Sequence, residues 1–133
     1  MAGLSPSQRT LKAMREQGRI VDIVERFISQ AGSFGIRKDF LGFVDMIALD
    51  PVDGIIAIQS CGQDFSGHVN KLLNERNENV YEWLKHGKCE IWAWRKTKYR
   101  LASGGYGKAM RWNPRVADVT LDEEGELQII ERK

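Results

Sequence analysis

Three polar side chains occupy positions where buried strands are expected, and their types suit metal chemistry. Asp45 interrupts the apolar run GFVDMIALD, Gln59 is the one long polar side chain at the end of IIAIQSCG, and Glu25 follows IVDIV. A bare buried carboxylate is costly, so Asp45 must be paired, hydrated or bound to a metal. Carboxylate and amide oxygens are ligands that Mg²⁺ accepts, so the three residues together indicate a possible metal site.

Two of these residues also have a structural interpretation. Backbone amides, or Arg37 or Lys38, would satisfy Asp45 at a strand end, and Glu25 would be an exposed strand glutamate. Asp39 lies on the same strand face as Asp45 but roughly 20 Å away along an extended chain. A shared metal would need a bend, for which Gly42 is suited, so we expect Asp39 to cap or position a loop instead.

The elements that must position these residues follow from capping and periodicity. Ser5, Pro6 and Gln8 form the start of a helix that should run to about Gln17 and stop at Gly18. Residues 20–27 and 40–49 are rich in strand-forming residues. The turn at 50–54, DPVDG, leads to a third strand at 55–60, so the second and third strands should form an antiparallel hairpin.

From about Ser66 the apolar residues fall at helical spacing as far as Leu84, and Gly87 ends the pattern. Residues 89–94, CEIWAW, should form a fourth strand, parallel to an earlier one because a helix intervenes. One or two further hairpins are expected after Thr97. Cys61 and Cys89 have no metal-ligand spacing, and we interpret both as small apolar strand residues.

Composition indicates one globular unit over residues 1–133, with a core at about 5–96 and a β extension at about 97–133. Of the 133 residues, 42% are hydrophobic and 29% charged, and no apolar run approaches the roughly 20 residues of a membrane span. No secretory signal is recognisable at the start, so the expected location is cytoplasmic. The net charge of +2 is uninformative, but basic and aromatic residues gather between Trp92 and Arg115. That stretch could follow a phosphate backbone, or it could be an ordinary exposed strand surface.

The predicted order of helix, three strands, helix and strand corresponds to the αβββαβ core of the PD-(D/E)XK nucleases, an α+β fold of the α/β-sandwich type with a mixed sheet. The segments VERF, RKDFLGFVDMIALD, IIAIQSCG and GHVNKLLNERNENVYEWLKHGKCEIWAWRK resemble small phage and bacterial PD-(D/E)XK-like proteins. The similarity covers about Lys12 to Lys96. It implies this nuclease core, to which the hairpins expected after Thr97 would be added.

The resemblance also implies roles for particular residues. Asp45 takes the place of the metal-binding Asp, Gln59 that of the motif Glu or Asp, and Glu25 that of an extra acid upstream, with the Ser60 carbonyl as a further ligand. The motif Lys, two residues after Gln59, is replaced by Cys61. Lys71 or His68, which share a face of the predicted helix, would supply positive charge instead, although Lys71 could equally be a solvated residue or a phosphate contact.

The expected function is that of a metal-dependent DNA endonuclease using Mg²⁺ or Mn²⁺ on duplex or branched DNA. Basic side chains would hold the flanking backbone: Arg37, Lys38, Arg95, Lys96 and Lys98. One alternative is a DNA-binding protein of the same fold that has lost cleavage, as Gln59 and Cys61 suggest. Another is a structural or interaction protein. A single compact site cuts one strand at a time, so double-strand cleavage would suggest a homodimer.

Overall fold

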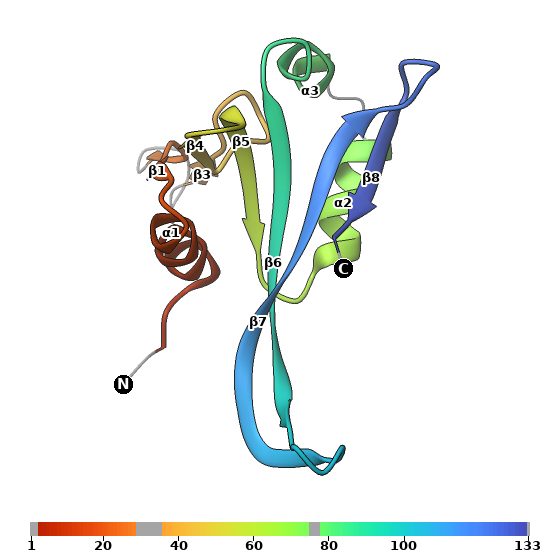
Figure 1. Cartoon of the computed structure of the whole chain (residues 1–133). Coiled ribbons are helices and arrows are strands. Elements are labelled where there is room, and N and C mark those ends of the chain that lie inside the picture. The colour runs from red at the N-terminus through yellow and green to blue at the C-terminus, as the bar shows by residue number, and fades with distance from the viewer. Residues whose placement is uncertain (1–2, 29–35, 75–77, 133) are drawn as a thin grey trace.

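The computed structural model describes residues 3–28, 36–74 and 78–132, and its centre is a six-stranded mixed sheet in the order β1-β4-β5-β6-β7-β8. The strands are β1 (Ile20–Ile23), β4 (Met46–Asp50), β5 (Gly54–Cys61), β6 (Lys88–Arg100), β7 (Tyr106–Leu121) and β8 (Leu127–Glu131). β5 and β6 are parallel, and every other neighbouring pair is antiparallel. Helices cover both faces of the sheet, which gives an α+β sandwich (Figure 1).

Helix α1 (Pro6–Glu16) begins and ends as its sequence predicts. Ser5 Oγ accepts the N–H of Gln8 at 3.2 Å, and the Gln8 side chain accepts the N–H of Ser5 at 3.0 Å. After the helix, Gly18 has a φ of 84°, a conformation that glycine adopts without strain. The helix packs against one face of the sheet over a cluster that includes Met14, Met46 and Trp94.

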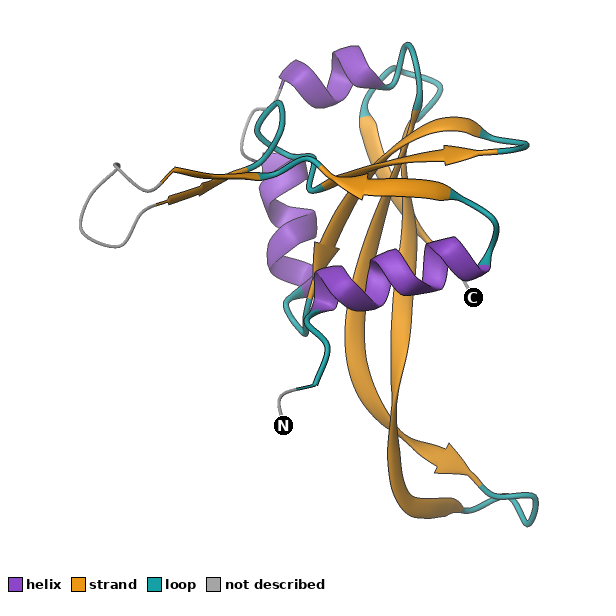
Figure 2. Ribbon diagram, turned by 90° about the vertical axis from the view of Figure 1, so that its left-hand side faces the viewer, coloured by secondary structure: helices purple, strands orange, loops and turns teal. Residues whose placement is uncertain are grey.

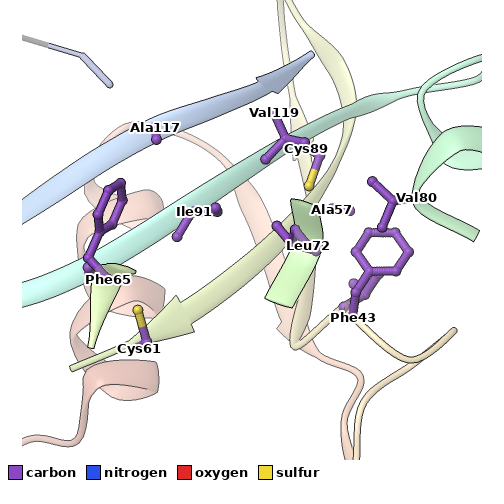
Figure 3. Close-up of a cluster of buried hydrophobic side chains, with 12 residues drawn as sticks. Phe43, Ala57, Cys61, Phe65, Leu72, Val80, Cys89, Ile91, Ala117 and Val119 are labelled. Atoms are coloured by element: carbon purple, nitrogen blue, oxygen red, sulfur yellow. The ribbon is translucent and has the colours of Figure 1, made fainter. Parts of the chain in front are cut away.

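The opposite face is covered by α2 (Phe65–Asn74) and α3 (Glu78–Trp83). Their apolar residues meet a core cluster that includes Phe43, Ala57, Cys89 and Ile91, shown in Figure 3. The prediction of one helix from Ser66 to about Leu84 is therefore wrong, since the two helices are separate elements; residues 75–77 lie outside the described chain. In the described residues, no helix is long and apolar enough to cross a bilayer.

Two predicted strands are shorter than expected. The strand predicted over 20–27 ends at Ile23, and the chain then enters a separate two-stranded sheet of β2 (Arg26–Ile28) and β3 (Ile36–Lys38). The strand predicted over 40–49 becomes β4, which starts only at Met46. Residues 40–45 instead contain a turn. Apolar alternation alone does not reveal where a chain reverses, so the sequence did not predict this turn. The small sheet projects from the body (Figure 2).

The remaining strand predictions are confirmed. β4 and β5 form the antiparallel hairpin, with Asp50 paired to Gly54, and β6 runs parallel to β5. Two hairpins follow, β6–β7 and β7–β8. β6 passes through position 97 without a break, so the C-terminal hairpins extend the central sheet directly.

A buried ionic network ties α1 to the sheet. Arg19, just after α1, donates from Nη1 and Nη2 to the two carboxylate oxygens of Glu90 at 2.9 and 3.1 Å, and from Nε to Asp50 at 2.8 Å. Glu90 is 1% exposed and also accepts from Trp92 and Arg132. Burial alone would raise the pKa of Glu90, but these hydrogen bonds and cations outweigh it and hold the pKa below its usual value.

Glu90→Ala should reduce the free energy of unfolding by about 3–5 kcal/mol, because it leaves the Arg19 guanidinium buried with half its partners. The matched control is Asp53→Ala, which breaks an exposed pair with Lys88 and should cost much less. Urea denaturation at neutral pH measures both. Since the pKa of Glu90 is lowered, the difference from wild type should shrink as the pH falls through the pKa of the folded protein. Equal effects of the two substitutions would contradict this interpretation.

Candidate metal centre

A tight turn between β3 and β4 brings Asp39 and Asp45 together. Phe40 and Val44 form an isolated antiparallel bridge in which each backbone N–H donates to the other's carbonyl at 2.9 Å. The turn is closed by Leu41 and Gly42, with φ values of 56° and 82°. Asp39 and Asp45 directly flank the bridged pair, so they lie opposite one another. The expectation that Asp39 would only cap or position the loop is therefore incomplete, because the turn also brings its carboxylate close to that of Asp45.

Glu25 reaches the same point from the end of β1. The backbone N–H groups of Val24 and Glu25 both donate to the Asp45 carbonyl, at 2.9 and 3.3 Å. This pairing fixes the chain where it leaves β1 for β2. Carboxylate oxygens of Glu25, Asp39 and Asp45 all lie within 4.8 Å of one another. The β1–β2 connection and the β3–β4 turn therefore bring three acidic groups to one point.

The end of β5 fixes the orientation of Asp45. The N–H of Ser60 donates to Asp45 Oδ2 at 2.8 Å, and the N–H of Asp45 donates to the Ile58 carbonyl at 2.9 Å. The Ser60 hydroxyl is hydrogen bonded to Thr10 of α1 at 2.8 Å. In this structure Ser60 thus serves the centre through its amide, whereas the sequence analysis assigned its carbonyl as a ligand.

The three carboxylates lie in an open pocket of about 840 Å³, which we call the acidic pocket. It is bounded by the first turn of α1, the β1–β2 connection, the end of β5 and α2. The lining residues are Ser5, Pro6, Ser7, Gln8, Ile23, Glu25, Arg26, Phe27, Asp39, Asp45, Ser60, Cys61 and His68. A pocket of this size at the end of a sheet leaves room for a phosphate group beside the carboxylates.

The crowding of negative groups shows in the electrostatics of Asp45, which is 7% exposed. Burial, a hydrogen bond to Asp39 and the charges of Asp39 and Glu25 raise the pKa of Asp45 to about 8, against the opposing effect of the Ser60 N–H. At neutral pH the Asp45 carboxyl group is consequently protonated for the most part, and a bound cation could displace that proton. An all-oxygen donor set of three carboxylates fits Mg²⁺ or Mn²⁺ better than softer metals.

Gln59 is adjacent to the centre but is not among the described residues that line the acidic pocket. Met46 pairs with Ile58, so one further step along both strands sets Asp45 beside Gln59. The Gln59 side chain is 2% exposed, and its Oε1 is buried with no hydrogen-bond partner in the described structure. Asp39 joins Glu25 and Asp45 in the acidic cluster, and Gln59 beside them stays a predicted ligand.

His68 contributes to the pocket from α2, whereas Lys71 is exposed and is absent from the described lining. Burial, the largest influence, and the charge of Lys71 lower the pKa of His68, although Asp64 and Asp39 act in the opposite direction. The imidazole is therefore neutral at pH 7, and its Nδ1 is buried without a hydrogen-bond partner among the described residues. Such a group suits proton acceptance better than the supply of positive charge.

Cys61 also lines the pocket, at the position where the motif has its Lys. Burial and the nearby charges of Asp45 and Asp64 raise the pKa of the Cys61 thiol to about 11. The side chain is thus a neutral thiol at physiological pH. It provides no counterpart to the ammonium group that the resemblance implies.

The predicted nucleic-acid contacts fall into two groups. Lys38 ends β3 with an exposed side chain, while the Arg37 side chain lies outside the described part of the structure. Arg95, Lys96 and Lys98 are exposed on β6. Arg26 lines the acidic pocket and was missed; only its place one residue after Glu25 could have indicated it.

Comparison with known proteins gives no further assignment for this arrangement. No family model, curated protein or solved structure matches the chain.

Proposed function

We propose that this protein is a metal-dependent DNA endonuclease of the PD-(D/E)XK type, with Asp45 at the centre of its metal site. The observation behind this proposal is the convergence of Glu25, Asp39 and Asp45, whose carboxylate oxygens lie within 4.8 Å of one another beside an open pocket. Phosphodiester hydrolysis commonly uses such a carboxylate cluster to hold divalent ions.

The connectivity supports this proposal. Apart from the inserted β2–β3 sheet, the chain runs through α1, β1, β4, β5, the α2 and α3 helices and β6, which is the order that the resemblance implies. Asp45 directly precedes β4, and Gln59 to Cys61 end the neighbouring strand β5. The two motif segments therefore meet at the same end of two neighbouring strands, where a nuclease of this type has its site.

Glu25, Asp39 and Asp45 would hold Mg²⁺ or Mn²⁺. The metal would supply Lewis-acid stabilisation of the phosphate and activation of the attacking water. The neutral His68 imidazole would accept a proton from that water. Arg26, on the pocket wall, would bind a phosphate oxygen and provide the positive charge that Cys61 lacks. Lys38 would hold the DNA backbone farther from the reaction.

A second candidate function is DNA binding without cleavage, and the neutral thiol at Cys61 favours it. In this second candidate, the acidic pocket would hold a structural ion or a proton, and the basic surfaces alone would bind DNA. Cleavage assays separate the two, since only the nuclease needs the carboxylates for turnover.

With Mg²⁺ or Mn²⁺, the wild type should cleave supercoiled, linear or branched DNA, and Asp45→Asn should reduce the rate about 100-fold or more, since it removes the central ligand. Asp53→Asn is the matched control, because it makes the same chemical change at the far end of the β4–β5 hairpin. Circular dichroism verifies equal folding. An unchanged rate in Asp45→Asn, or no cleavage of any substrate by the wild type, would contradict the nuclease assignment.

Asp39→Asn should weaken Mn²⁺ binding about 10- to 100-fold, as Glu25→Gln should, because both carboxylates share the cluster. Gln59→Leu, which changes a residue outside the pocket lining, should have a smaller effect. Isothermal titration calorimetry measures all three variants. A larger loss of Mn²⁺ affinity in Gln59→Leu than in Asp39→Asn would indicate that Gln59, and not Asp39, is the third ligand.

Metal binding should release a proton, because the pKa of Asp45 is raised to about 8. The apparent Mn²⁺ affinity should thus increase with pH by up to about tenfold per unit and level off above the pKa. Without metal, the folded protein retains a proton that the unfolded chain loses, so stability should fall as pH rises from the usual Asp pKa towards 8. Asp45→Asn should abolish both dependences. Calorimetry in buffers of different ionisation enthalpy counts the proton, and a pH-independent affinity would refute the linkage.

A further inference from the structure

The β6–β7 hairpin continues beyond the sheet as a two-stranded ribbon. β5 accompanies β6 only as far as Ala93, and β8 accompanies β7 only from Ala117, yet β6 and β7 stay paired out to Arg100 and Tyr106. We call residues 94–116 the ribbon. Its β6 strand alone reaches roughly 24 Å, and beyond its contacts with α1 it projects from the body in both views (Figures 1 and 2).

The ribbon carries charge of one sign. The sequence from Ile91 to Ala117 contains Lys and Arg but no Asp or Glu. Arg95, Lys98 and Lys108 are exposed, and none of them forms a salt bridge with a carboxylate in the described structure. A positive arm of this kind attracts a polyanion.

The two faces of the ribbon differ. On the face towards α1, Trp94 donates from Nε1 to Thr10 at 2.8 Å, and the guanidinium of Arg9 lies 4.2 Å from the ring centre of Trp112. The other face is polar, and Asn113 donates to Thr97 Oγ1 across the strands. Its outward residues are Arg95, Thr97, Arg111 and Asn113.

We propose that the ribbon is a duplex-DNA-binding arm that enters the major groove, with its polar face towards the base edges. The B-DNA major groove, about 12 Å wide, admits a two-stranded β-ribbon. Arg and Asn are side chains that read guanine and adenine there. Lys98, which by register shares the face of Trp94 and Trp112, and Lys108 lie near the tip, where their long side chains reach sideways to the phosphates that border the groove.

The tryptophans argue for a duplex over a single strand. Single-strand binding uses exposed aromatic rings on which bases stack. Trp92 and Trp94 are only 3% and 7% exposed, and Trp112 is already covered by Arg9, so among the described side chains of the ribbon only Tyr106, 68% exposed, offers an open ring. Duplex RNA fits poorly as well, because its major groove is too narrow and deep for side chains to read.

The ribbon also starts beside the acidic pocket. Cys61, which lines the pocket, pairs with Ala93, the residue just before the ribbon. DNA held by the ribbon would pass this end of the sheet. The cleavage of that DNA rests on the proposed function, whereas its binding does not.

The test is fluorescence anisotropy with a 20-base-pair DNA duplex in EDTA, where no cleavage occurs. Lys98→Ala/Lys108→Ala should weaken binding on the order of 10- to 100-fold and lower the salt slope by about 2. The matched control is Lys85→Ala/Lys88→Ala, which removes the same charge at the opposite end of the sheet and should change little. Thermal denaturation verifies that both variants fold.

Groove choice is tested by competition. Methyl green, a major-groove ligand, should displace the protein, whereas netropsin, a minor-groove ligand, should not. Duplex RNA and single-stranded DNA should bind at least about tenfold more weakly. Equal losses in the two double variants, displacement by netropsin alone, or tighter binding of either other nucleic acid would overturn the proposal.

The result also separates the arm from the nuclease. Ribbon-dependent binding in EDTA, together with no cleavage in Mg²⁺ or Mn²⁺, would support the arm and reject the endonuclease. Asp45-dependent cleavage that is insensitive to Lys98→Ala/Lys108→Ala would support the endonuclease and reject the arm.

Discussion

The guanidinium of Arg19 is the contact on which the arrangement of this protein depends. It joins the end of α1 to Asp50 on β4 and Glu90 on β6 through three hydrogen bonds. A buried charge of this kind tolerates few alternative geometries, because each missing partner exposes an uncompensated ion to a low-dielectric interior. The network therefore specifies one position of α1 across the sheet. Through Thr10, the helix then reaches Ser60 and Trp94, one beside the carboxylate cluster and one at the root of the ribbon.

Local signals predicted much of the fold. The capping box at Ser5 and Gln8 located the start of α1, the DPVDG turn located the β4–β5 hairpin, and the helix before Cys89 implied that β6 runs parallel to β5. These features depend on neighbouring residues, so a single sequence contains them. The departure of β2 into a second sheet depends on pairing with β3, and no local pattern near Glu25 indicates that partner.

The site was predictable in part, for a similar reason. Asp45 and Glu25 stood out because acidic residues interrupt or end apolar runs, and the structure brings them together. Asp39 was assigned to the loop because DFLGFVD alternates as an extended strand would. The turn places Leu41 at positive φ, which bulky residues seldom adopt, so only Gly42 hinted at a reversal. Gln59 followed from the motif position, whereas Asp39 is a residue that the motif does not specify, and only the turn brings it to the cluster.

The ribbon has a consequence for how copies of this protein behave in solution. Outside its own pairing, each strand of the ribbon exposes a row of backbone donors and acceptors, which is a template for adding another strand. Pro114 removes one donor from that edge, and the uniform positive charge makes two ribbons repel each other at low ionic strength. The same charge that draws in a polyanion thus discourages the ribbons from associating edge to edge. High salt would weaken both effects together, so solubility and nucleic-acid affinity are coupled through a single surface.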